Sequence, residues 1–288
     1  MKPGEDTPNS SRNLSPGPAL YLVATPIGNL EDITLRALRV LKETDLIACE
    51  DTRQTRKLLD RYGISTPLIS YHEHNEQSRS EDLLREILAG KNIALVSDAG
   101  TPLIADPGYR LVERALERGV AVSPIPGPAA LLAALSASGL PTDSFLFQGF
   151  LPPKKGQRRK LLEELKQLQS TLVFYEAPHR ILDTLGDIGE ILGVRPVVVA
   201  RELTKIHEEF LRGTAAEIHD ALGSRASVKG EIVLMIGKSE TQEVDDTPIE
   251  AAVEKLVQSG VARMEAYKTV ARQRGLSKRE VYKLINEG

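Results

Sequence analysis

The chain has 288 residues, of which 41% are hydrophobic and 27% are charged, and its formal net charge is −3. This length favours two domains, the apolar runs are too short to cross a membrane, and the N-terminal segment lacks the apolar core of a signal peptide. The single cysteine, Cys49, excludes an internal disulfide and offers no zinc-site spacing, so the sequence predicts a cytoplasmic protein that does not use a membrane.

The first half of the chain alternates short apolar runs with longer amphipathic ones. Residues 1–18 are rich in Pro, Ser, Gly and Asn, which predicts disorder. Strands are then expected at 20–24, 46–49, 68–71, 93–96 and 120–123, and helices at 33–42, 51–61, 80–89 and 109–117. This alternation is typical of an α/β fold with a largely parallel sheet, whose strand ends gather where ligands bind. We therefore expect a first α/β domain at 19–125.

The second half repeats the alternation. Prolines crowd residues 124–128, where they break any regular element and predict a hinge into a second α/β domain at 126–238. A helix of small residues is expected at 129–138, followed by strands at 145–148, 172–175, 197–200 and 232–236. The polar, acidic segment 239–248 predicts a linker. Residues 249–288 predict a small helical tail, in which Ser277 and Glu280 have the spacing of a capping box.

Known ligand motifs are scarce. The sequence has no G-x-G-x-x-G after an expected strand and no G-x-x-x-x-G-K-[ST], which argues against the usual dinucleotide and nucleoside-triphosphate sites. His72-Glu73-His74 brings two histidines to one side of an extended segment without a third ligand, so no metal site is predicted.

Loops rich in glycine and proline follow the expected strands instead. They lie at 24–30, 97–108, 124–130, 175–180 and 200–205. Glycine and proline fix the backbone shape there and let a ligand contact amides and carbonyls directly. Such a site suits a ligand that is recognised through adenine, ribose and amino-acid groups rather than through phosphates.

Two segments carry an excess of basic residues. Residues 154–160 hold five basic residues in seven, and residues 261–288 have a local charge of +4. Such segments are either solvated faces or contacts to phosphate. If the partner is a nucleic acid such as RNA, the residues that would contact its phosphates are Lys154, Lys155, Arg158, Arg159, Lys278 and Arg279.

Several stretches of the sequence resemble a known family. Residues 23–37 resemble the first loop of the tetrapyrrole (corrin/porphyrin) methylase superfamily, and residues 25–30 (T-P-I-G-N-L), 50–53 (E-D-T-R), 70–76 (S-Y-H-E-H-N-E) and 97–108 together are similar to one branch of it. The resemblance extends over residues 19–237 and is closest to a branch that methylates the ribose 2′-oxygen of a cytidine in 16S ribosomal RNA. It implies two α/β domains with S-adenosyl-L-methionine in a cleft between them. It also implies a homodimer that acts on the small ribosomal subunit and not on DNA.

The resemblance further implies roles for individual residues. The expected cofactor contacts are Ile27, Asp98, Gly100, Thr101, Ile104, Ala129, Ala130 and Tyr175. Thr101 stands where relatives carry an aspartate, and Asp98 is the expected replacement for that acceptor. A ribose 2′-hydroxyl is a poor nucleophile at neutral pH, so a base or a neighbouring cation is needed. The candidate catalytic residues are Glu50, Arg53, Glu176, His179 and Arg201, with Lys205 as a further cation.

Two other functions stay open at this point. The same fold and cofactor would serve to methylate a tetrapyrrole ring, which would have no use for the basic tail. A non-enzymatic RNA- or ribosome-binding module is the second alternative. If the acceptor is RNA, a surface on which a base stacks would depend on Tyr71, Tyr175, Phe150 or the histidines, because the sequence has no tryptophan.

Overall fold

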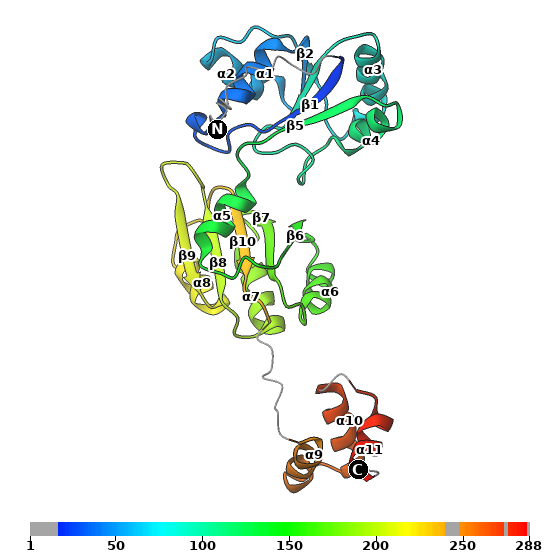
Figure 1. Ribbon diagram of the computed structural model, residues 1–288. Helices are drawn as coiled ribbons and strands as arrows, with labels where there is room; N and C mark the ends of the chain where they lie inside the picture. Colours follow the sequence, from blue (N-terminus) through cyan, green and yellow to red (C-terminus); the bar gives the residue numbers. More distant parts are fainter. Residues whose placement is uncertain (1–16, 240–247, 274–275, 287–288) are drawn as a thin grey trace, which may run out of the picture. The chain divides into compact units, whose positions relative to one another are not determined.

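The structure, a computed structural model, describes residues 17–239, 248–273 and 276–286 (Figure 1). Nearly all of the expected disordered segment at 1–18 and of the expected linker at 239–248 therefore lies outside the described residues. The chain divides into two compact units. One comprises Met1–Lys166 and Ser170–Lys238, and the other comprises Gln167–Gln169 and Ser239–Gly288.

The first sheet is wholly parallel, as the alternation of elements predicts. Its strand order is β3-β2-β4-β1-β5. The strands are β1 (Ala19–Val23), β2 (Leu46–Cys49), β3 (Leu68–Ser70), β4 (Ile93–Val96) and β5 (Ala121–Ile125). A short 3₁₀ helix, η1 (Leu30–Asp32), follows β1.

Helices cover both faces of this sheet, because successive strand residues point to opposite sides. Tyr21 and Val23 pack with α1 (Leu35–Glu43) and α2 (Thr52–Arg61). Leu20 and Leu95 pack on the other face with α3 (Glu76–Leu88) and α4 (Tyr109–Glu117), as Figure 1 shows. Both faces are buried, so the strands read as continuous apolar runs in the sequence.

The second sheet is mixed, which corrects the expectation of parallel strands in this half. Its order is β6-β7-β10-β8-β9, and the strands are β6 (Phe145–Phe150), β7 (Thr171–Glu176), β8 (Val197–Arg201), β9 (Glu209–Gly213) and β10 (Ile232–Ile236). Only β6 and β7 are parallel, while β10 runs antiparallel to both its neighbours. Residues 202–208 join β8 to β9 as a hairpin, because so short a connection cannot cross over to a parallel position.

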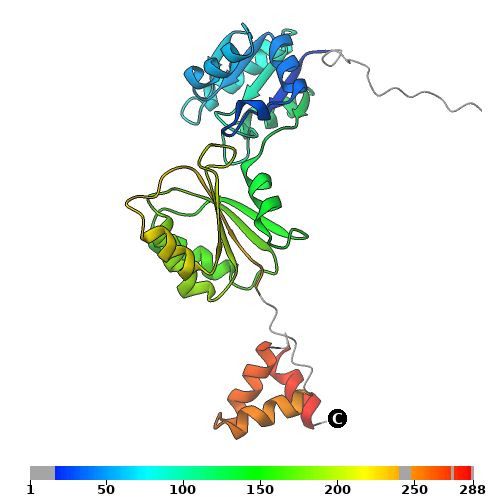
Figure 2. The same ribbon diagram turned by 90° about the vertical axis from the view of Figure 1, so that its left-hand side faces the viewer.

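Four helices cover this second sheet. On one face lie α6 (Lys155–Leu165), α7 (Ile181–Leu192) and α8 (Ala215–Gly223), and on the other lies α5 (Ala130–Ser138), as Figure 2 shows. A capping box between Thr214 and Glu217 begins α8, and Gly139, with a φ of +82°, ends α5.

The C-terminal unit is a group of three helices, as expected for the tail. They are α9 (Ile249–Gln258), α10 (Arg263–Gln273) and α11 (Lys278–Asn286). Val253, Tyr267, Val270 and Val281 form their common core. The predicted capping box is present, since Ser277 N donates to Glu280 Oε2 at 2.7 Å and Glu280 N donates to Ser277 Oγ at 3.2 Å. Among the described residues of the whole chain, no helix is both long and apolar enough to cross a membrane.

Candidate active site

A cavity of about 360 Å³ lies where the carboxyl ends of strands from both sheets meet. Its lining comes from the loops after β1, β4 and β5, from the ends of β6 and β7, from the loop after β8 and from the start of β10. Most of the lining side chains are apolar. A volume of this size falls within the range of roughly 300–1,000 Å³ that is typical of small-molecule sites.

Hydrogen bonds connect the loops after β1, β4 and β5, which together form one wall of the cavity. Thr25 N donates to Gly100 O at 2.8 Å, and Gly100 N donates back to Thr25 O at 3.0 Å. The Thr25 hydroxyl donates to Ser97 O, and the Thr101 hydroxyl donates to Pro128 O, both at 3.1 Å. Gly100 has a φ of +81°, which suits glycine. The turn residues of 97–108 therefore bind this loop to its neighbours.

Strained backbone surrounds two apolar side chains of the cavity. Leu103 (φ +72°) and Ala105 (φ +63°) flank Ile104, and Glu202 (φ +53°) and Thr204 (φ +64°) flank Leu203. Left-handed backbone costs a residue with a Cβ atom on the order of 1–3 kcal/mol and is concentrated at functional sites. Ile104 and Leu203 both line the cavity, so the strain occurs in the two loops that shape it.

Gly28 allows the loop after β1 to touch the loop after β8. A Cβ atom at Gly28 would lie 2.6 Å from Lys205 Cγ and 2.7 Å from Thr204 Oγ1. Next to it, Asn29 N donates to Thr204 Oγ1 at 3.0 Å. This close approach requires glycine and connects the two α/β halves beside the cavity.

The expected cofactor contacts come together here, with one exception. The cavity is lined by Ile27, Gly100, Thr101, Ile104, Ala129, Ala130 and Tyr175. Asp98 does not line it. Its carboxylate instead accepts from Asp51 N at 2.9 Å, immediately before α2. This hydrogen bond connects the loop after β4 to the start of α2.

Asp106, one of three acidic residues that line the cavity with Glu176 and Glu231, is absent from the residues expected from the sequence. Burial raises the pKa of its carboxyl, the hydrogen bond from Ser97 lowers it, and the charge of Asp98 raises it, with a net upward shift. None of the ion pairs among the described residues includes Asp106. In the sequence, Asp106 is the second aspartate of the 97–108 loop, and the pattern alone does not distinguish it from a turn residue.

Two of the expected catalytic residues follow β2 and lie outside the cavity lining. Glu50 is exposed, and shielding from water together with the charges of Asp98 and Asp106 raises the pKa of its carboxyl. Arg53 has an 88% exposed side chain, whose Nη2 lies 2.8 Å from Asp51 Oδ2. Hydrogen bonds from Arg53 hold the pKa of Asp51 at about 2.

Glu176, which is expected to be a base, has a carboxylate that is engaged by neighbouring residues. It is 2% exposed, and both its oxygens are occupied. Oε1 accepts from Ala177 N at 2.7 Å and from Arg180 Nε at 2.9 Å, and Oε2 accepts from the Thr184 hydroxyl at 2.8 Å. Glu176 therefore holds the start of α7, although the residue itself lines the cavity.

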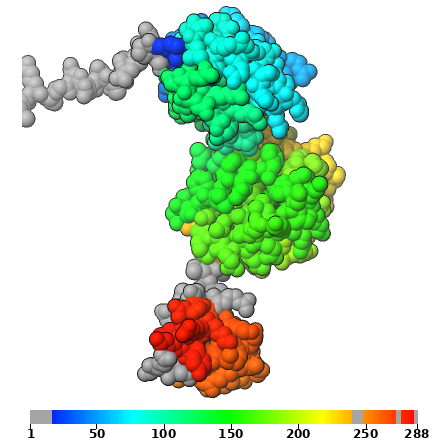
Figure 3. All heavy atoms as spheres, turned by 90° about the vertical axis from the view of Figure 1, so that its right-hand side faces the viewer, coloured from blue at the N-terminus to red at the C-terminus, as the bar shows by residue number. Residues whose placement is uncertain are grey.

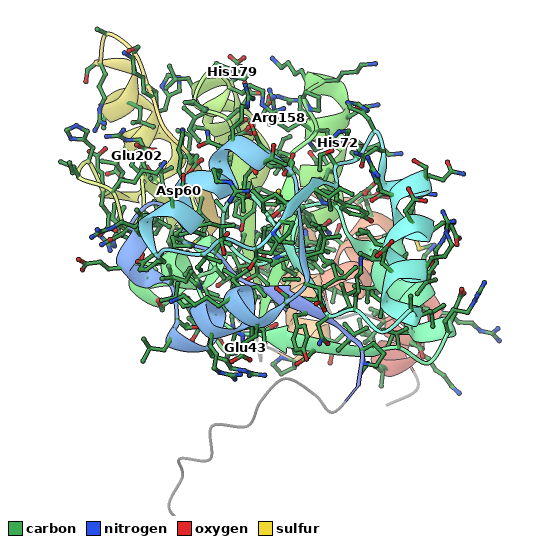
Figure 4. All side chains as sticks on the ribbon, turned by 90° about the horizontal axis from the view of Figure 1, so that it is seen from above. Glu43, Asp60, His72, Arg158, His179 and Glu202 are labelled. Atoms are coloured by element: carbon green, nitrogen blue, oxygen red, sulfur yellow. The ribbon has the colours of Figure 1, made fainter. Side chains whose placement is uncertain are left out.

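Arg201 and His179, the remaining expected catalytic residues, and the further cation Lys205 do not line the cavity. Arg201 pairs with Glu209 at 3.1 Å and donates to Lys229 O at 2.9 Å. Lys205 bonds Glu202 at 2.9 Å and Glu231 at 3.0 Å. His179 is exposed in the turn before α7, and Figure 4 labels it on a different element from Glu202 of the loop after β8.

The basic segment at the start of α6 is only partly a surface. Lys154 and Lys155 are exposed. Arg158, by contrast, is 3% exposed, and its Nη2 lies 2.6 Å from Oδ2 of the buried Asp187 on α7. Arg159 also pairs with Asp187, at 2.9 Å. Arg158 shares the inner face of α6 with Leu162 and Leu165, so its expected contact with RNA is corrected to a core ion pair. Helix α6 lies on the side of the molecule that Figure 3 shows.

The described residues contain no group of three or more His, Cys, Asp or Glu side chains that could hold a metal ion.

Comparison with known proteins gives a consistent set of similarities. The family described as Tetrapyrrole (Corrin/Porphyrin) Methylases matches residues 19–219. A Halalkalibacterium halodurans protein named ribosomal RNA small subunit methyltransferase I is 52% identical over 276 residues, which cover 93% of this chain and 94% of the relative. A Bacillus subtilis protein of the same name is 48% identical over 91% of this chain and 92% of its own length.

Among solved structures, uroporphyrin-III-C-methyltransferase from Thermus thermophilus has the same fold, with a TM-score of 0.55 and 21% identity. The match covers 77% of this chain and 95% of that protein.

Proposed function

The chain belongs to the tetrapyrrole (corrin/porphyrin) methylase family, and from this premise we propose that it is an S-adenosylmethionine-dependent methyltransferase of the small ribosomal subunit. The proposed acceptor is the ribose 2′-oxygen of a cytidine in 16S ribosomal RNA. The observation that carries the proposal is the identity of about half the residues, over more than nine-tenths of both chains, with relatives named for ribosomal RNA methylation. The protein named uroporphyrin-III-C-methyltransferase has only 21% sequence identity with this chain, so that similarity supports the fold alone.

The cavity fits the proposed cofactor in size and in chemistry. Ile27, Ile104 and Leu203 offer apolar surface for a flat adenine ring, and the loop of Gly100 and Thr101 brings backbone groups to the same wall. The carboxylate of Glu231, a further residue of the lining, is shared with Lys205 and adds negative charge that suits a cationic group. Bound there, S-adenosylmethionine would supply a methyl group that is already activated by a positively charged sulfur.

The chain's own part in the reaction is positioning and proton transfer. The joined loops after β1, β4 and β5 form a wall that orients the reacting groups and excludes water, and orientation alone can supply much of the acceleration. In such a transfer the 2′-hydroxyl would lose its proton as its oxygen bonds to the methyl carbon, while the bond from that carbon to sulfur breaks and leaves a neutral thioether. We assign that proton to the Asp106 carboxylate, because Glu176 is held by Arg180 and Thr184, and Glu231 is paired with Lys205. Its raised pKa makes Asp106 a stronger base than an ordinary aspartate.

Contacts to the RNA would lie outside the cavity. The exposed Lys154 and Lys155, with Lys278 and Arg279 of the C-terminal unit, supply positive charge for phosphates. We also propose that the working form is a homodimer, which sedimentation of the purified chain over a range of concentrations would test. A monomer at micromolar concentration would contradict it.

Transfer of a tritiated methyl group tests the proposed function. The acceptors are unmethylated small ribosomal subunits, naked 16S RNA and a uroporphyrinogen control, and the labelled nucleotide is then mapped. Label on the ribose of a single cytidine is the expected result. Label in the tetrapyrrole alone would move the function to that substrate. Binding of the cofactor without label in any acceptor would favour a non-enzymatic binding module.

A further inference from the structure

An aromatic ring stands exposed at the edge of the cavity. Phe150, the last residue of β6, lines the cavity and is 57% exposed. Two tyrosines are also candidates for stacking, and of these Tyr71 is 1% exposed. Tyr175 is half-buried, and its hydroxyl is bonded to the backbone of Leu131. Within the described lining, Phe150 is thus the aromatic side chain with a free face.

An irregularity in β6 determines the side of the sheet on which the Phe150 ring lies. Phe147 pairs with Val173 and Phe150 pairs with Tyr175, so three steps along β6 match two along β7. Residues three apart on a regular strand face opposite sides. The extra residue, next to Gly149 with its φ of +66°, brings Phe150 to the same side as Phe147. β-Bulges beside active sites commonly redirect a side chain in this way.

The ring is also supported from behind. Tyr175 lies between the two phenylalanines, with ring centroids 4.9 Å from Phe147 and 5.6 Å from Phe150, both edge to face. A Cβ atom at Gly149 would lie 3.8 Å from Ala105 Cβ, which places the bulge against the strained loop after β4. An aromatic ring held in this manner loses little freedom when a ligand stacks on it.

We propose that Phe150 is the platform on which the base of the target nucleotide stacks. This inference rests on the proposed function. A base beside the reacting ribose has to leave its helix, and an aromatic face then replaces the lost stacking. The adenine of the cofactor is the other flat group, but the apolar side chains that suit it, Ile27, Ile104 and Leu203, belong to the loops after β1, β4 and β8, whereas Phe150 ends β6 and is 57% exposed.

The test uses the full-length chain with three substitutions. Phe150→Leu removes the aromatic face and keeps an apolar side chain, and Phe150→Tyr keeps the face. Phe145→Leu is the matched control, because Phe145 is on the same strand and 42% exposed but does not line the cavity. The measurements are kcat and KM for methyl transfer to unmethylated small subunits, the Kd for S-adenosylmethionine by calorimetry, and the thermal midpoint as a check on folding.

We expect Phe150→Leu to lower kcat/KM for the subunit at least ~10-fold, since stacking of one base on an aromatic residue is worth roughly that much or more. The cofactor Kd should stay at the wild-type value, and Phe150→Tyr and Phe145→Leu should remain close to wild type. Wild-type kcat/KM in Phe150→Leu would overturn the inference while leaving the function standing. A tenfold weaker cofactor Kd would overturn it in favour of adenine stacking, and an equal loss in Phe145→Leu would reduce it to a general surface effect. An inactive wild-type chain would overturn the function first and this inference with it.

Discussion

Asp98 and Asp106 belong to the same loop, yet only Asp106 lines the cavity. Asp98 is engaged by the backbone of Asp51, whereas Asp106 is bonded by the hydroxyl of the buried Ser97. Two identical side chains therefore have different chemistry, because one caps a neighbouring segment and the other is shielded from water. At the scale of single residues, burial and hydrogen-bond partners decide which carboxylate is suited to accept a proton.

Asp106→Asn should lower kcat for methyl transfer by about 100-fold or more, the usual contribution of a general base. The wild-type rate should fall as the pH drops through the raised pKa of Asp106, because only the ionised carboxylate accepts the proton. This acid limb of the pH–rate profile should lie at a higher pH than the pKa of an ordinary aspartate. The variant should have no such limb. Rate profiles of both proteins at saturating cofactor check this, and an unchanged profile in the variant would assign the base elsewhere.

Gly28→Ala should destabilise the protein by about 1–3 kcal/mol, since the added methyl group overpacks the contact with Thr204 and Lys205. It should also weaken cofactor binding, because this contact lies beside the cavity. Gly186→Ala is the control: Gly186 is an exposed residue of α7 with open space at its Cβ position, so alanine should be neutral or stabilise by up to about 1 kcal/mol. Urea unfolding and calorimetry measure both effects, and equal stability of the two variants would contradict the close approach.

At the scale of elements, the helical periodicity of α6 exposes some residues of a basic run and buries others. The run 154–160 reads as one positive patch in the sequence, but the turn of the helix exposes Lys155 and buries Arg158 against α7. Asp187 is buried, which raises the pKa of its carboxyl, but hydrogen bonds from Arg158 and Arg159 prevail and lower it. The pair thus stays ionised and ties the two helices together.

Arg158→Met should cost roughly 3 kcal/mol of unfolding free energy, the lower end of the cost of breaking a buried ion pair, because Arg159 still reaches Asp187. Lys155→Met should leave the stability unchanged. For RNA binding we expect Lys155→Met to have the larger effect of the two. It should reduce the salt dependence of the affinity by about one phosphate contact. Urea unfolding and filter binding at several salt concentrations distinguish the two, and a stable Arg158→Met protein with weaker RNA binding would restore the original prediction for Arg158.

At the scale of the whole molecule, the three C-terminal helices have a core of their own and form a unit separate from the sheets. The described residues that line the cavity belong to the first unit. Cofactor binding and substrate recognition are therefore expected to be separable. Attachment of a second binding module raises overall affinity without altering the catalytic cavity.

Deletion of residues 249–288 should leave the cofactor Kd unchanged and raise KM for the small subunit ~100-fold, the lower end of the gain from a tethered second module. Lys278→Ala with Arg279→Ala in the full chain should raise KM in the same direction with a smaller effect. Calorimetry and methyl transfer check both proteins, and full activity of the shortened chain on subunits would show that the tail is dispensable for RNA.

Local sequence patterns are enough to predict the α/β class, the parallel first sheet, the helical tail with its capping box, and the loops that line the cavity. These depend on local periodicity, on turn residues and on caps, which act over a few neighbouring positions. Only the tertiary structure decided the antiparallel strands of the second sheet, the burial of Arg158 and Glu176, and the choice of Asp106 over Asp98. The physical reason is that strand direction, ion pairing and shielding from water depend on partners distant in the chain, as Asp187 is from Arg158.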